Sequence, residues 1–76
     1  MVVFFVLLKV NTGKEQEVLN AVKNIPEVKE CHIIAGEYDV IVILSGDRND
    51  LQKALLGQLR RIRNITQTIS LIEVEI

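Results

Sequence analysis

The residues best suited to chemistry in this 76-residue chain are Gly36, Glu37, Tyr38 and Asp39, which lie between two apolar runs. A simple hairpin turn needs only glycine with asparagine or aspartate, so Glu37 and Tyr38 exceed what a turn requires. The residues alone leave two interpretations open. In one, Asp39 hydrogen-bonds local amides and Tyr38 packs on a neighbouring surface. In the other, the 36–39 loop is a binding site, because loops carry functional residues disproportionately.

Catalytic and metal-binding residues are scarce. The chain has one histidine and one cysteine, His32 and Cys31, and no glycine-rich phosphate loop. Zinc sites use three or four ligands. Neighbouring residues of a strand point to opposite faces, so His32 cannot activate Cys31 as a nucleophile. We therefore expect no metal, no cofactor and no enzyme activity, and we interpret Cys31 as a small packed hydrophobe.

Three arginines, Arg60, Arg61 and Arg63, form the main basic cluster. They could bind an anion or a phosphate backbone, or they could be the solvated end of a helix whose dipole they complement. We favour the second interpretation, because no other basic cluster supports the first. A net charge of −1 and a pI of about 5.7 also argue against direct nucleic-acid binding.

Hydropathy patterns predict six elements that would position these residues. The runs 2–10 and 40–44 are apolar on both faces, which is typical of central strands. A Thr12-x-x-Glu15 capping box begins the first helix, and Asn49 is expected to cap the second. The predicted strands are 2–10, 28–35, 40–44 and 66–76, and the predicted helices run from after Thr12 to before Pro26 and from after Asn49 through the three arginines.

This element order predicts a ferredoxin-like α/β (α+β) fold, with a four-stranded antiparallel sheet and two helices on one face. The other face of the sheet is left bare, and its first and third strands carry apolar residues there. A 76-residue domain without a disulfide is marginally stable alone, and a large exposed apolar patch marks an interface. We expect one domain over 1–76 that forms a homo-oligomer through its sheet, as in dimeric α+β barrels.

The apolar N-terminal run does not indicate export or a membrane. It lacks a basic start and a small-residue cleavage site, and it is far shorter than the ~18 apolar residues of a membrane span. A single unpaired cysteine suits a reducing compartment. The expected location is the cytoplasm.

Several motifs occur in a characteristic order: the capped first helix, Ile25-Pro26-Glu27-Val28, the 36–39 loop, and Thr68-Ile69-Ser70. Together they resemble the C-terminal effector domain of Lrp/AsnC transcription regulators, over essentially the whole chain. No DNA-binding segment precedes them in this sequence, as in the stand-alone RAM modules (regulation of amino-acid metabolism) of that family. Two departures are Ser70 in place of a second threonine, and Arg63-Asn64 in place of Pro-Gly.

The resemblance implies a domain that dimerises through its sheet, dimers that assemble into rings, and amino acids bound between neighbouring dimers. An amino acid needs an acceptor for its ammonium, which Asp39 or Glu37 can supply, and donors for its carboxylate, which a Gly36-region amide and the hydroxyls of the last strand can supply. By this resemblance the ligand-binding residues are Gly36, Glu37, Tyr38, Asp39, Thr68 and Ser70.

The expected function is therefore that of a non-enzymatic, amino-acid-sensing module that oligomerises and modulates full-length Lrp/AsnC regulators. Two alternatives remain. One is a small dimeric α+β-barrel enzyme, such as a monooxygenase-like domain, although the chain has no tryptophan and one histidine to line an active site. The other is a purely structural assembly protein that binds no ligand.

Overall fold

The computed structural model describes residues 1–74 of the chain. Its elements follow one another as β–α–β–β–α–β, with a short 3₁₀ turn, η1, after the second helix. In chain order they are β1 (Val2–Val10), α1 (Glu15–Val22), β2 (Val28–Ile33), β3 (Val40–Gly46), α2 (Arg48–Gly57), η1 (Leu59–Arg61) and β4 (Ile65–Ile72).

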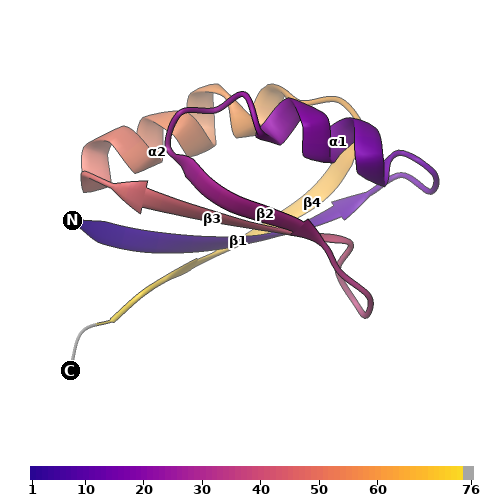
Figure 1. Ribbon diagram of the computed structural model, residues 1–76, viewed down its shortest axis with the longest axis horizontal. Helices are drawn as coiled ribbons and strands as arrows, with labels where there is room; N and C mark the ends of the chain where they lie inside the picture. The colour runs from indigo at the N-terminus through magenta and orange to yellow at the C-terminus, as the bar shows by residue number, and fades with distance from the viewer. Residues whose placement is uncertain (75–76) are drawn as a thin grey trace.

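The four strands form one antiparallel sheet in the order β2-β3-β1-β4. Both helices cover the same face of this sheet, and no element of residues 1–74 covers the opposite face (Figure 1). The predicted ferredoxin-like fold is thus confirmed, since right-handed strand–helix–strand connections place both helices on one side. The central strands β1 and β3 are the two whose sequences are apolar on both faces.

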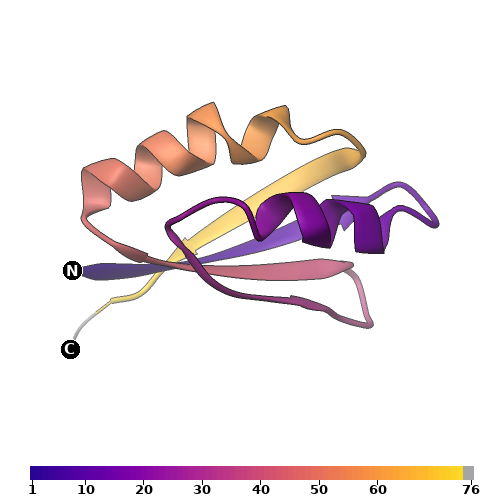
Figure 2. The same ribbon diagram turned by 45° about the horizontal axis from the view of Figure 1, so that its top comes forward.

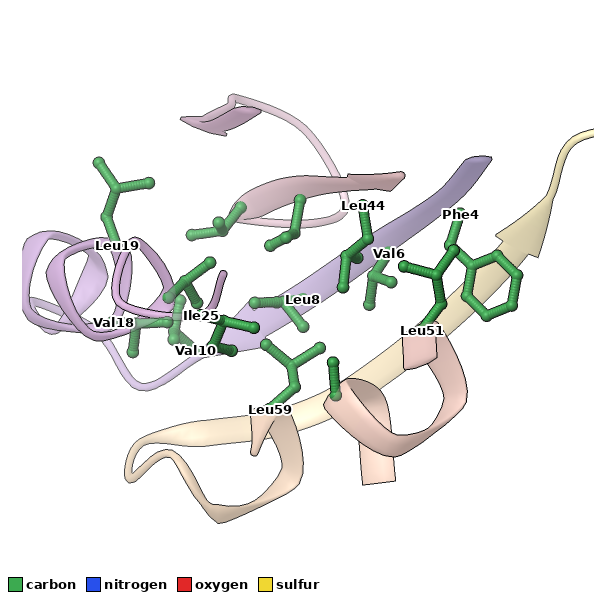
Figure 3. Close-up of a cluster of buried hydrophobic side chains, with 14 residues drawn as sticks. Phe4, Val6, Leu8, Val10, Val18, Leu19, Ile25, Leu44, Leu51 and Leu59 are labelled. Atoms are coloured by element: carbon green, nitrogen blue, oxygen red, sulfur yellow. The ribbon is translucent and has the colours of Figure 1, made fainter. Parts of the chain in front are cut away.

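The core lies between the sheet and the helices (Figure 3). Alternate residues of β1 point into it, and the helices contribute Val18, Leu51 and Leu59, none of which is exposed. Burying each such side chain contributes about 1.5–3 kcal/mol to stability. The buried residues of β1 and β3 are Phe4, Val6, Leu8, Val10, Val40, Val42 and Leu44.

The two helices begin differently from the prediction. α1 starts at Glu15, its N-cap is Lys14, and no side chain caps it, so the predicted Thr12 capping box is wrong. Gly13 has φ +84° and the Lys14 N–H donates to the Asn11 carbonyl at 3.0 Å, so a turn replaces the box. At α2 the cap is Asp47, whose Oδ1 accepts from the Asn49 N–H at 2.9 Å; the prediction of Asn49 as the cap is wrong by two residues.

The second helix also ends earlier than predicted. The α-helix stops at Gly57, and the chain continues as a 3₁₀ turn that buries Leu59 completely. Arg60 and Arg61 lie in that turn, and Arg63 follows it. The prediction that the three arginines occupy the last turn of an α-helix is wrong, because glycine and the tighter turn interrupt the helix before them.

The edge strands differ from the prediction in length and regularity. β2 ends at Ile33 rather than residue 35, and β4 begins at Ile65 and ends at Ile72; residues 75–76 of the predicted last strand lie outside the described residues. A bulge at Lys29 puts Val28 and Cys31 on the same, helix-covered face, paired with Leu44 and Val42. The prediction that the side chains of this strand alternate strictly between the two faces is therefore wrong at Lys29. The extra residue of a bulge reverses the faces to which the following side chains point.

The uncovered face of the sheet is apolar, as predicted. Residues on it alternate with the core residues of the same strands, and most are partly exposed. Leu71 at the edge is 50% exposed. The residues that we call the bare face are Val3, Phe5, Leu7, Ile41, Ile43, Ile69 and Leu71.

Candidate functional site

The 36–39 loop lies at the end of the β2–β3 hairpin. Its base is closed by a hydrogen bond of 2.9 Å from the Ile34 N–H to the Asp39 carbonyl. Gly36 has φ +131°, a left-handed conformation that favours glycine. Gly36 and Glu37 are exposed, and Tyr38 and Asp39 are partly buried, so the loop presents a free carboxylate to solvent.

Asp39 joins this loop to the central strand β1 through two contacts. Its N–H donates to the Leu8 carbonyl at 2.9 Å, and its Oδ2 accepts from the Val10 N–H at 2.9 Å. The carboxylate thus takes the place of a backbone carbonyl just beyond the end of the β1–β3 ladder. Within residues 1–74 the Oδ1 atom accepts no hydrogen bond, so half of the carboxylate is available to a ligand.

Tyr38 contacts the one charged residue of β1. The Nζ of Lys9 lies 5.4 Å from the centroid of the Tyr38 ring, within cation–π range. The packing interpretation of Tyr38 therefore describes the chain correctly, although the partner is a cation and not an apolar surface. Our sequence reasoning missed Lys9, and its signal was a single charge in the otherwise apolar run 2–10.

Thr68 and Ser70 lie on the helix-covered side of the edge strand β4. They pair with Leu8 and Val6, whose side chains are fully buried on that side. Thr68 is partly buried and Ser70 is exposed. The structure confirms that the two hydroxyls share one strand face, since each pairs with a residue of the same face of β1.

The two predicted halves of the site therefore flank β1 from opposite sides. Asp39 contacts Leu8 and Val10 from the β3 side, and Thr68 pairs with Leu8 from the β4 side. They are separated by two strand spacings, roughly 10 Å. The Tyr38 ring also contacts Lys9, which lies between the buried residues Leu8 and Val10 and so points to the bare face of the sheet. Thr68 and Ser70 lie on the opposite, helix-covered face. One copy of the chain does not bring all six residues into a single pocket.

The turn before β4 is held by Asn64 in place of the glycine that the resemblance leads one to expect. Asn64 has φ +73°, a conformation that asparagine tolerates better than most residues. Its carbonyl accepts from the Asn11 N–H at 2.9 Å, and its Nδ2 donates to Glu17 Oε2 at 3.0 Å. The turn is thereby tied to the first turn of α1.

Cys31 and His32 lie on opposite faces of β2, as predicted. Cys31 packs against the core, and burial raises the pKa of its thiol, an effect that the positive charge of Lys23 partly opposes. His32 is exposed, and its Nε2 lies 3.3 Å from Glu30 Oε1. Among residues 1–74 no three histidine, cysteine or carboxylate side chains are grouped as a metal site would require.

Residues 3–75 match the family model described as Lrp/AsnC ligand binding domain. An HTH-type transcriptional regulator of Pyrococcus furiosus, PF0250, is 29% identical over 72 residues, which are 90% of this chain and 48% of that protein. The chain thus spans about half the length of this curated relative, and 39–41% of two other such regulators from Pyrococcus.

Solved structures share the fold. The hypothetical protein PHS023 from Pyrococcus horikoshii superposes with a TM-score of 0.91 at 36% identity, covering 99% of this chain and 92% of that one. A transcriptional regulator from Neisseria meningitidis, NMB0573 in complex with L-Met, superposes with a TM-score of 0.81 at 19% identity, covering 97% of this chain and 50% of that one. At that identity the second likeness shows the fold alone. No helix within residues 1–74 is long and apolar enough to cross a membrane.

Proposed function

The chain belongs to the Lrp/AsnC ligand-binding domain family, and we propose that it is an amino-acid-binding regulatory module that acts as a homo-oligomer. The family and the relatives named as HTH-type transcriptional regulators support a regulatory role. The observation that carries the amino-acid proposal is the 36–39 loop. It offers the exposed carboxylate of Glu37 and the free Oδ1 of Asp39, each able to accept from an ammonium group.

Self-assembly through the bare face is supported by its composition. Seven apolar side chains lie together on β1, β3 and β4, and neither α1 nor α2 covers them (Figure 1). A second copy offers the same apolar surface, so packing two sheets face to face would remove both from water. Such an interface would also offset the small core of a 76-residue domain.

A ligand site shared between copies follows from the placement of the two motifs. The 36–39 loop and the hydroxyls of Thr68 and Ser70 lie on opposite sides of β1, so a ligand that contacts both sets is best held between two chains. We place the amino acid there, with its ammonium at the loop of one copy and its carboxylate at β4 of another. Binding would then be coupled to assembly, which is how a sensing domain can regulate.

The same surfaces suit assembly with full-length Lrp/AsnC regulators, because those proteins carry a domain of the same fold. In this part of the proposal the chain exchanges into their oligomers through the bare face and alters their response to an amino acid. We expect the chain to copurify with such a regulator from its own organism. The Leu71→Lys variant should fail to form this complex.

Isothermal titration calorimetry against the twenty amino acids tests the sensing function, with L-methionine first because the Neisseria regulator was solved with it. We expect saturable heat from at least one amino acid. Asp39→Asn keeps a side-chain acceptor for Val10 but removes the charge, so it should weaken that binding about tenfold or more. No heat from any amino acid would overturn the sensing function.

A further inference from the structure

A hollow of about 230 Å³ lies at the open edge of the sheet, between η1 and the start of β4. Figure 2 shows the course of the backbone there: the chain leaves α2, passes through η1 and turns back into β4 beneath it. β4 is an edge strand of the sheet formed by residues 1–74, so no further strand in that range closes the hollow on its outer side. Its lining residues are Arg60, Ile65, Thr66, Gln67 and Thr68.

The hollow presents one cation and one free hydroxyl. The Arg60 side chain is exposed and, among residues 1–74, forms no ion pair. The Thr66 hydroxyl is already used, since it donates to the Lys9 carbonyl at 3.2 Å. The Thr68 hydroxyl makes no hydrogen bond to the residues that the structure describes, so it remains available as a donor.

Among residues 1–74 no carboxylate lines the hollow, and its one charged lining residue is Arg60. A guanidinium and a hydroxyl donor that line the same hollow can together bind a carboxylate, because two parallel N–H groups of arginine match its two oxygens. Ile65 adds an apolar wall. The same fork of arginine also binds inorganic phosphate, so the experiments below use a carboxylate as the probe.

We propose that Arg60 and Thr68 form the carboxylate-binding half of the ligand site. This inference rests on the proposed function and deepens it: Arg60 holds the α-carboxylate of the bound amino acid, and the ammonium is held by the 36–39 loop of a second copy. Arg61 and Arg63 do not line the hollow and serve as charge-matched controls. The helix-dipole interpretation of Arg60 now concerns only the three-residue turn η1, because α2 ends at Gly57.

A first experiment tests the half-site without any amino acid. Sodium acetate is titrated into ¹⁵N-labelled protein, with sodium chloride as the control for ionic strength, and the Arg60 side-chain Nε–H and the Thr68 amide are followed by NMR. Saturable shifts at these two groups, absent at Arg61 and Arg63, are expected. Equal shifts at all three arginines, or identical effects of acetate and chloride, would overturn the half-site.

A second experiment uses whichever of the twenty amino acids gives calorimetric heat with the wild-type protein. Arg60→Gln should weaken its binding about tenfold to a hundredfold, the usual effect of losing a charged hydrogen-bond partner, and Arg61→Gln should leave it unchanged. Arg60→Lys should restore only part of the affinity, because lysine lacks the fork. Unchanged binding in Arg60→Gln would overturn the inference while the sensing function stands.

The two proposals fail separately. If no amino acid binds but acetate shifts Arg60 and Thr68 selectively, the sensing function falls and a carboxylate site for another ligand remains. Arg60 is exposed, so its replacement should not unfold the domain. A thermal melt of each variant verifies this before titration.

Discussion

The side-chain Oδ2 of Asp39 accepts a hydrogen bond of 2.9 Å from the backbone N–H of Val10, 29 positions earlier in the chain. This contact fixes the 36–39 loop against the central strand just beyond the last pair of the β1–β3 ladder. It also leaves the second oxygen of the carboxylate available. Asp39 therefore has a structural role that leaves one carboxylate oxygen free, so the packing interpretation and the proposed binding role are compatible.

Replacing Asp39 separates these two roles. Asp39→Ala leaves the partly buried Val10 N–H without its acceptor, and we expect a loss of about 1–2 kcal/mol in the free energy of unfolding, measured by urea denaturation. Asp39→Asn keeps a carbonyl oxygen for that bond and should stay close to the wild type. Equal stability of the alanine variant and the wild type would show that the hydrogen bond does not anchor the loop.

We expect replacement of Asn64 by glycine to destabilise the protein less than replacement by alanine. Asn64 has φ +73°, and at this angle the β-carbon of any residue other than glycine crowds the backbone, which destabilises the fold by roughly 1–2 kcal/mol. Asn64→Ala also loses the side-chain hydrogen bonds to Asn11 and Glu17. Asn64→Gly loses the same side-chain bonds but relieves the backbone, so it should be the more stable variant by about 1 kcal/mol. Thermal unfolding followed by circular dichroism compares the pair. A more stable alanine variant would contradict the assigned backbone conformation.

Two leucines of similar exposure can test whether the bare face is the surface through which copies assemble. Leu71 on β4 is 50% exposed and Leu56 on α2 is 54% exposed, but only Leu71 belongs to the bare face. Leu71→Lys should convert the proposed oligomer to smaller species at micromolar concentration, because it would place a charge in the proposed apolar interface. Leu56→Lys should leave assembly unchanged. Size-exclusion chromatography with light scattering measures both, and a monomeric wild type would refute assembly through this face.

Cys31 should react slowly with thiol reagents. Burial raises the pKa of its thiol above the ordinary value of 9.0, and Lys23 lowers it by a smaller amount. Less thiolate is present at pH 8 than in a free peptide, so modification by 5,5′-dithiobis(2-nitrobenzoic acid) should be slower than that of glutathione. Lys23→Ala should slow it further. A rate equal to that of glutathione would contradict the packed placement of the thiol.

The same pKa shift predicts a dependence of stability on pH. Because the folded thiol holds its proton more tightly than the unfolded one, the stabilisation is complete below the unfolded pKa, near 9, and is lost as pH rises through the higher folded value. The wild type should therefore lose stability relative to Cys31→Ala between pH 8 and pH 11. Urea denaturation at several pH values tests this, and a constant difference between the two proteins would contradict it.

The sequence alone determined the fold and the bare face of this protein. Strand and helix periodicities are local, so the order of the elements and the apolar sides of β1 and β3 could be predicted from neighbouring residues. Right-handed connections then placed both helices on one face. The shared face of Thr68 and Ser70 and the opposite faces of Cys31 and His32 followed from the same period.

The tertiary structure decided where the elements end and how the candidate site is divided. The bulge at Lys29 and the bond from Val10 to Asp39 depend on pairing with other strands, which neighbouring residues do not reveal. The cap by Asp47 is local, but only the folded backbone shows that Asp47, and not Asn49, accepts the hydrogen bond. Only the folded chain shows that β1 separates the 36–39 loop from β4. It also places Arg60 and Thr68 on the lining of one hollow, because the 3₁₀ turn packs its buried Leu59 into the core and leaves Arg60 exposed.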